Sequence, residues 1–103
     1  MEFKQLIARA KEIKKVNVEL TQKEECKTWG LEERTMGFVG DVGSLAKLIM
    51  AKNGYRKYDD LDKKLAHELA DCLWSVIVIA DEAGIDLEEA FINTMEEIEQ
   101  RKK

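Results

Sequence analysis

Residues 61–83 read LDKKLAHELADCLWSVIVIADEA, and this stretch decides the fold. Apolar residues recur in its first half at the three- and four-residue spacing of a helix with one buried face. These residues are Leu61, Leu65, Leu69 and Cys72. The second half, residues 73–80, is apolar on nearly every side. Its Val and Ile residues leave a buried strand as the alternative, but the periodic pattern leading into it favours one helix over residues 60–83.

The apolar run at residues 73–80 also bears on assembly. A helix that is apolar all round has to be covered all round. A single chain of 103 residues has few other elements to cover it with. We therefore expect burial of this run in a subunit interface, and at least a dimer.

The same spacing predicts three further helices, at residues 2–15, 31–52 and 87–101. The last one has a capping box at its start, where Asp86 is followed by Glu89. The prediction is a single all-α domain over residues 1–103, an antiparallel four-helix bundle completed by oligomerisation.

The segment after the first helix leaves several structures open. Residues 16–20 alternate between apolar and polar, so the helix could break, bend or continue there. Thr21 followed by Glu24 resembles a capping box that would begin a new helix.

Composition excludes several classes of protein. The chain has 21 Asp+Glu against 17 Lys+Arg, and the net charge of −4 disfavours nucleic-acid binding. No apolar run reaches the ~20 residues that span a bilayer, and the first residues do not resemble a signal peptide. The two cysteines have no zinc-binding spacing. We expect a cytoplasmic protein with no membrane partner.

Three carboxylates lie beside the predicted apolar stripes, whereas most of the other acidic residues fit solvated helix faces. Asp41 borders the apolar stripe of the 31–52 helix, which is formed by Phe38, Val42, Leu45 and Ile49. Glu68 and Asp71 share one face of the next helix at i, i+3 spacing. Carboxylates at a helix seam repel each other unless a divalent cation such as Mg²⁺ lies between them. In the alternative, Glu68 pairs with Lys64 and Asp71 only flanks the core.

Other residues near these carboxylates have weaker patterns. Gly37, Gly40 and Gly43 lower helix propensity, which suggests close helix packing or the close approach of a ligand. Lys47 could meet phosphate groups or lie on a solvated face. His67, the only histidine, could act as a general base, although a surface or capping role fits it better.

Three segments together resemble a known family. They are residues 40–48 (GDVGSLAKL), 67–73 (HELADCL) and 84–91 (GIDLEEAF). They are similar to the MazG-type all-α nucleotide pyrophosphohydrolases. The resemblance implies Mg²⁺, with Mn²⁺ as a substitute, held by acidic side chains. It also implies cleavage of a nucleoside triphosphate between its α- and β-phosphates, and assembly as a homodimer or a dimer of dimers.

The family's acidic motifs are only partly present. They are Glu-Glu-x-x-Glu on one helix and Glu-x-x-Asp on the next, and Glu68 and Asp71 match the second motif. Asp41 stands at the second Glu of the first motif, while Gly40 and Ser44 stand where the family has its other two Glu. Charge of −3 suffices for one Mg²⁺ with waters but argues against a two-metal clamp. Ser44 could hold a metal-bound water.

The resemblance also implies a role for Asn93, which stands near the position of a nucleotide-facing Asn in the family. The predicted function is a Mg²⁺-dependent nucleoside triphosphate pyrophosphohydrolase, with Asp41, Glu68 and Asp71 as catalytic metal ligands and with Ser44, Lys47 and Asn93 as substrate contacts. Gly40 and Ser44 support an alternative, a non-catalytic oligomer of the same fold that binds a nucleotide or a protein partner. A plain helical interaction module is the third possibility.

Overall fold

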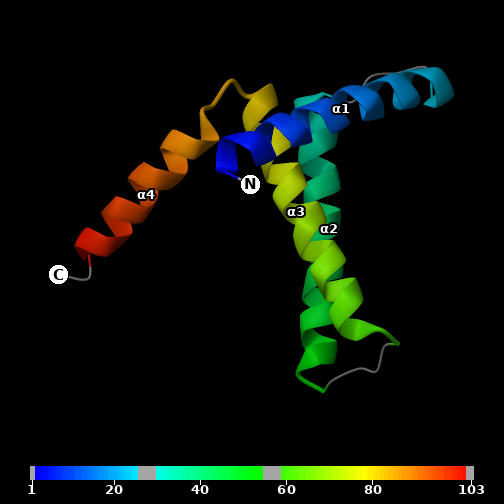
Figure 1. Ribbon diagram of the computed structural model, residues 1–103. Helices are drawn as coiled ribbons and strands as arrows, with labels where there is room; N and C mark the ends of the chain where they lie inside the picture. Colours follow the sequence, from blue (N-terminus) through cyan, green and yellow to red (C-terminus); the bar gives the residue numbers. More distant parts are fainter. Residues whose placement is uncertain (1, 26–29, 55–58, 102–103) are drawn as a thin grey trace. The chain divides into compact units, whose positions relative to one another are not determined.

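The computed structural model describes residues 2–25, 30–54 and 59–101, and most of these residues are helical. The helices are α1 (Phe3–Glu25), α2 (Leu31–Lys52), α3 (Leu61–Glu82) and α4 (Leu87–Arg101) (Figure 1). The described residues contain no strand, which confirms the all-α class. No helix within these ranges is long and apolar enough to cross a membrane.

The predicted bounds of the last three helices agree with the structure to within one residue. Residues 73–80 are helical throughout, so the strand alternative is wrong. The prediction that Thr21 begins a new helix is also wrong, because α1 runs without a break to Glu25. The Ser/Thr-x-x-Glu pattern caps a helix only where the preceding backbone is not helical. Here the backbone from residue 16 to residue 20 is already helical.

The chain divides into two compact units, which we describe separately. One unit contains residues 1–28 and 77–103, so it includes α1, the end of α3 and α4. The other contains residues 29–76, so it includes α2 and most of α3.

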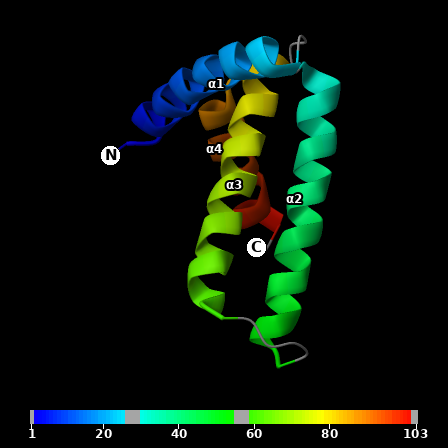
Figure 2. The same cartoon turned by 90° about the vertical axis from the view of Figure 1, so that its right-hand side faces the viewer.

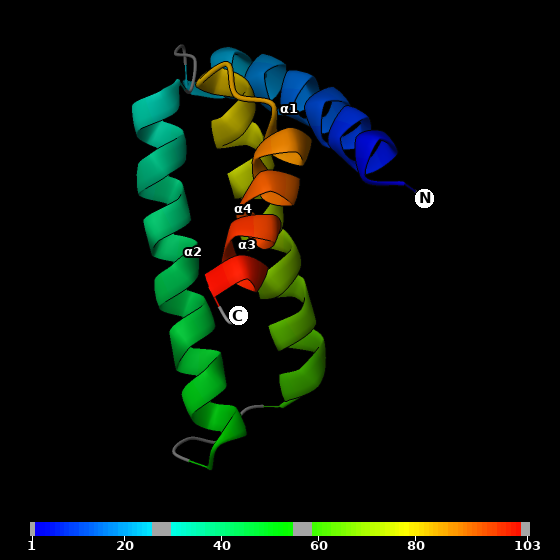
Figure 3. The same cartoon turned by 90° about the vertical axis from the view of Figure 1, so that its left-hand side faces the viewer.

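In the unit of residues 29–76, α2 and α3 run antiparallel and side by side (Figures 2 and 3). α2 ends at Lys52 and is followed by Asn53 and Gly54, and Gly54 takes a φ of 89°, a left-handed conformation that glycine adopts without strain. Beyond this turn, the Lys52 ammonium lies 2.5 Å from the Asp62 carboxylate at the start of α3. Further along the pair, the Arg34 guanidinium lies 5.5 Å from the centre of the Trp74 ring, a cation–π contact.

In the unit of residues 1–28 and 77–103, ionic contacts join α1 to the end of α3. The Lys14 ammonium lies 2.8 Å from Asp81 and 2.7 Å from Glu82, and Lys11 lies 3.5 Å from Asp81. The Lys14 side chain is 16 % exposed, so its pairs with Asp81 and Glu82 are shielded better than ordinary surface pairs. They hold α1 against α3 in a defined register.

Burial corrects one of our expectations about residues 73–80. Ile77, Val78 and Ala80 are only 4 %, 1 % and 7 % exposed within the single chain. The chain therefore covers these three side chains itself, and they do not require a subunit interface. Leu73, at 50 % exposure, is the large apolar residue of the run that stays half uncovered.

α4 begins as its sequence predicts. The Asp86 carboxylate accepts a hydrogen bond of 3.1 Å from the backbone N–H of Glu89, as in an N-terminal cap. Phe91 contacts Phe3 of α1, with ring centres 6.3 Å apart. None of the residues of α4 is fully buried.

Candidate metal centre

The three predicted carboxylates come together within the unit of residues 29–76. Asp41 is on α2, and Glu68 and Asp71 are on α3. One oxygen from each side chain lies within 4.8 Å of the oxygens of the other two. All three side chains are partly buried.

The local structure explains this convergence. Glu68 and Asp71 are three residues apart on one helix, so their side chains leave α3 from the same face. α2 lies beside this helix (Figures 2 and 3) and brings Asp41 to that face. Oxygens bound to a common Mg²⁺ lie about 2.1 Å from the ion, hence at most about 4.2 Å from each other. Small side-chain movements would bring the three oxygens to that spacing.

Glu68 is the carboxylate of the cluster whose ionised form is least favoured by its surroundings. Burial raises the pKa of its carboxyl, and the neighbouring carboxylates of Asp41 and Asp71 raise it further. Its Oε1 atom is buried and has no hydrogen-bond partner among the described residues. A buried polar atom left in this state costs free energy. A bound cation would satisfy the oxygen and offset the repulsion, so the residues present fit a divalent metal.

Cys72 follows Asp71 and responds to the same charges. Burial raises the pKa of its thiol, and Asp41, Glu68 and Asp71 raise it further. The thiol therefore stays protonated at neutral pH, which disfavours a role as nucleophile or soft-metal ligand.

Two further side chains contact the cluster. The Ser75 hydroxyl donates a 3.3 Å hydrogen bond to Oδ2 of Asp41, and Ser75 is only 7 % exposed. The Nε2 atom of His67 lies 3.2 Å from Oδ2 of Asp71, one helical turn away, with the imidazole largely in solvent. The surface position predicted for His67 is confirmed. Its contact with Asp71 was missed, although the i, i+4 spacing could have indicated it.

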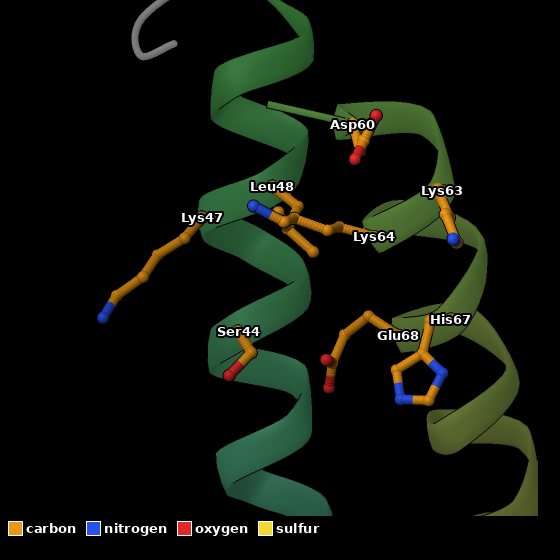
Figure 4. Close-up of a pocket in the computed structure, with 8 residues that line it drawn as sticks. All are labelled: Ser44, Lys47, Leu48, Asp60, Lys63, Lys64, His67 and Glu68. Atoms are coloured by element: carbon orange, nitrogen blue, oxygen red, sulfur yellow. The ribbon is translucent and has the colours of Figure 1, made fainter. Parts of the chain in front are cut away.

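A pocket of about 570 Å³ opens beside Glu68, between α2 and the start of α3 (Figure 4). The lining residues are Ser44, Lys47, Leu48, Asp60, Lys63, Lys64, His67 and Glu68. Figure 4 shows Glu68 and Lys64 pointing from α3 toward α2, whereas Lys47 extends away from α3. Lys63 and Lys64 also line this pocket, and the sequence predicted no phosphate contact for either of them.

The other positions that the sequence singled out lie on α2 and α4. Ser44 is exposed on α2 and lines the pocket together with Glu68. A Cβ added at Gly40 or Gly43 would meet no described atom within 4 Å, so close helix packing does not explain these two glycines. Asn93 is exposed on α4, which belongs to the other unit. Its role toward a nucleotide stays a prediction.

These features define an all-α protein with an acidic cluster and an adjoining pocket, lined in part by lysines, between two antiparallel helices. Residues 32–103 match the MazG nucleotide pyrophosphohydrolase domain. The chain belongs to this family, as its sequence motifs suggested. No curated protein and no solved structure matches the chain.

Proposed function

We propose that the protein is a Mg²⁺-dependent nucleoside triphosphate pyrophosphohydrolase that releases a nucleoside monophosphate and pyrophosphate. The observation that carries the proposal is the convergence of Asp41, Glu68 and Asp71, with a buried Glu68 oxygen that lacks a partner. Membership of the MazG nucleotide pyrophosphohydrolase family supports it independently.

Asp41, Glu68 and Asp71 would hold a single Mg²⁺, or Mn²⁺ in its place. Bound there, the ion would neutralise phosphate charge and acidify a water molecule. The family's first motif has three Glu, but this chain has Gly40 and Ser44 at two of those positions. With three charged ligands, one ion completed by waters and substrate oxygens fits better than a two-metal clamp.

The pocket beside Glu68 would receive the triphosphate. Lys63 and Lys64 line it, and the ammonium of Lys64 reaches across toward α2. Ammonium groups stabilise phosphate oxygens through charge-assisted hydrogen bonds. Water would attack the α-phosphorus, a nearby carboxylate would accept its proton, and the bond to the oxygen that bridges the α- and β-phosphates would break. Pyrophosphate would leave with that oxygen.

A second candidate is a non-catalytic protein of the same fold that binds a nucleotide or a protein partner. The neutral residues at positions 40 and 44 favour it, because each removes a carboxylate that the family's first motif has. Under either function we propose a homodimer or a dimer of dimers. Half-exposed apolar side chains support such assembly, among them Leu73, Phe91 and Ile92.

The test is pyrophosphate release from a panel of canonical and modified nucleoside triphosphates with Mg²⁺ or Mn²⁺. Release by the wild type that is lost in Glu68→Gln, but kept in Glu32→Gln, supports the enzyme. Glu32 is a matched control because it is exposed in the first turn of α2 and outside the cluster. If no triphosphate is cleaved but one raises the melting temperature in the presence of metal, the binding function is supported instead.

A further inference from the structure

The buried hydroxyl of Ser75 contacts the acidic cluster from within the helix pair. Ser75 follows Asp71 by four residues, so it lies one turn further along the same side of α3. Its Oγ donates to Oδ2 of Asp41, which belongs to α2. The contact therefore joins the two helices at the one carboxylate that α2 contributes.

We propose that Ser75 is a positioning residue, which orients the Asp41 carboxylate toward the metal. The proposal rests on the proposed function, because it requires that Asp41, Glu68 and Asp71 hold a divalent ion. Asp41 stands where the MazG family's first motif has Glu, so its carboxylate is on a shorter arm and reaches less far from α2. A hydrogen bond to one oxygen restricts rotation of that carboxylate and leaves the other oxygen for the metal.

The surroundings of Ser75 suit this role. At 7 % exposure, a serine hydroxyl needs a partner inside the protein, and Asp41 supplies one. Glu68 has a buried oxygen that lacks such a partner. Asp41 therefore accepts a hydrogen bond from a hydroxyl, whereas one oxygen of Glu68 accepts none. This is expected if Ser75 orients Asp41 as a metal ligand and if the Glu68 oxygen is satisfied only by a bound cation.

The test is the affinity for Mn²⁺ alone, measured by electron paramagnetic resonance of free Mn²⁺, without nucleotide. Ser75→Ala should weaken binding about tenfold, the loss typical when a group that orients a metal ligand is removed. Ser75→Thr keeps the hydroxyl and should restore most of the affinity. Thr35→Val is the control, since its hydroxyl donates to the Leu31 carbonyl on the exposed side of α2, away from the cluster.

A double-mutant cycle separates positioning from a general effect on folding. In the Asp41→Asn background, Ser75→Ala should cause little further loss of Mn²⁺ affinity, because the carboxylate that it orients is gone. Equal losses in both backgrounds, or an unchanged affinity in Ser75→Ala, would overturn the role of Ser75. If Asp71→Asn leaves the wild-type affinity unchanged, the proposed metal site itself is wrong. The two failures are therefore distinguishable.

Discussion

Asp41 and Glu68 are 27 residues apart in sequence and on different helices, yet each offers a carboxylate oxygen within 4.8 Å of the other. The pairing follows from the antiparallel packing of α2 and α3. Burial raises the pKa of the Glu68 carboxyl, and the negative charge that this pairing brings close raises it further. The ionised Glu68 carboxylate should therefore lower the stability of the metal-free protein, although the proposed metal site needs it.

Replacing Glu68 by Gln should stabilise the metal-free protein. A raised pKa means that the ionised carboxylate is less stable in the folded chain than in the unfolded chain, so at neutral pH it lowers stability. Removing the charge should raise the free energy of unfolding by about 1 kcal/mol, the size typical of one stabilising substitution. The melting temperature should rise by about 4–8 °C. Thermal unfolding with EDTA checks this result.

The pH dependence supplies the control. The advantage of Glu68→Gln should be full above the raised pKa and should vanish as the pH falls below the ordinary pKa of 4.5, where the wild-type carboxyl is protonated in both the folded and the unfolded chain. An advantage that persists unchanged in acid would show that charge repulsion is not its cause.

Adding a carboxylate at position 44 should strengthen metal binding. Ser44 lines the pocket beside Glu68, and the motif resemblance predicts that it stands where the MazG family has Glu. Ser44→Glu is expected to lower the Kd for Mn²⁺ by about tenfold, since each hard oxygen ligand adds to the affinity of a Mg²⁺-type site. Ser44→Gln has the same length without the charge and should give a much smaller change. An unchanged Kd in Ser44→Glu would show that position 44 does not face the site.

Removing the ammonium of Lys64 should weaken substrate binding more than turnover. Lys64→Met should raise the KM for a triphosphate about tenfold, because one charge-assisted hydrogen bond contributes about 1.5 kcal/mol. Steady-state pyrophosphate release measures KM and kcat separately. Lys23→Met, at an exposed position on α1, should leave both constants unchanged. An unchanged KM in Lys64→Met would show that Lys64 does not contact the phosphates of the substrate.

The ion pairs between Lys14 and the end of α3 should contribute to the free energy of unfolding only within a defined pH range. The hydrogen bond from Lys14 lowers the pKa of Asp81 below its ordinary value of 3.8, against the opposing effect of burial. Burial lowers the pKa of Lys14, but its hydrogen bonds to Asp81 and Glu82 outweigh this and raise it above 10.5. The Asp81 contribution is thus present above pH 3.8 and is lost as the pH falls through the lowered pKa. The Lys14 contribution is present below pH 10.5 and is lost as the pH rises through the raised pKa.

Asp81→Asn tests this pH range. At neutral pH it should lower the free energy of unfolding by about 1.5 kcal/mol, the scale of a hydrogen bond to a charged group. Urea unfolding across the acid range should show the difference from wild type closing as the pH falls below 3.8. A difference of the same size at every pH would assign the effect to packing instead.

Much of the fold could be predicted from apolar spacing, because each helix has to bury one face. The continuity of α1 could not, since a capping pattern carries no information on whether the backbone before Thr21 is already helical. The burial of Ile77 and Val78 within one chain depends on packing between distant segments, which spacing does not reveal.

The candidate site was predictable in part for a similar reason. The i, i+3 spacing places Glu68 and Asp71 on one face, and the family motif adds Asp41. The contact from Ser75 to Asp41 crosses between two helices and depends on their register, so the residue pattern alone could not indicate it. The same is true of Lys63 and Lys64, whose place in the pocket depends on how α3 lies against α2.

The most direct test of the metal centre is a Mn²⁺ titration of the wild type and of Asp71→Asn, followed by electron paramagnetic resonance. We predict that the wild type binds one Mn²⁺ per chain, that excess Mg²⁺ displaces it, and that the affinity is at least about tenfold lower in Asp71→Asn. Equal Mn²⁺ binding by the two proteins would contradict this prediction.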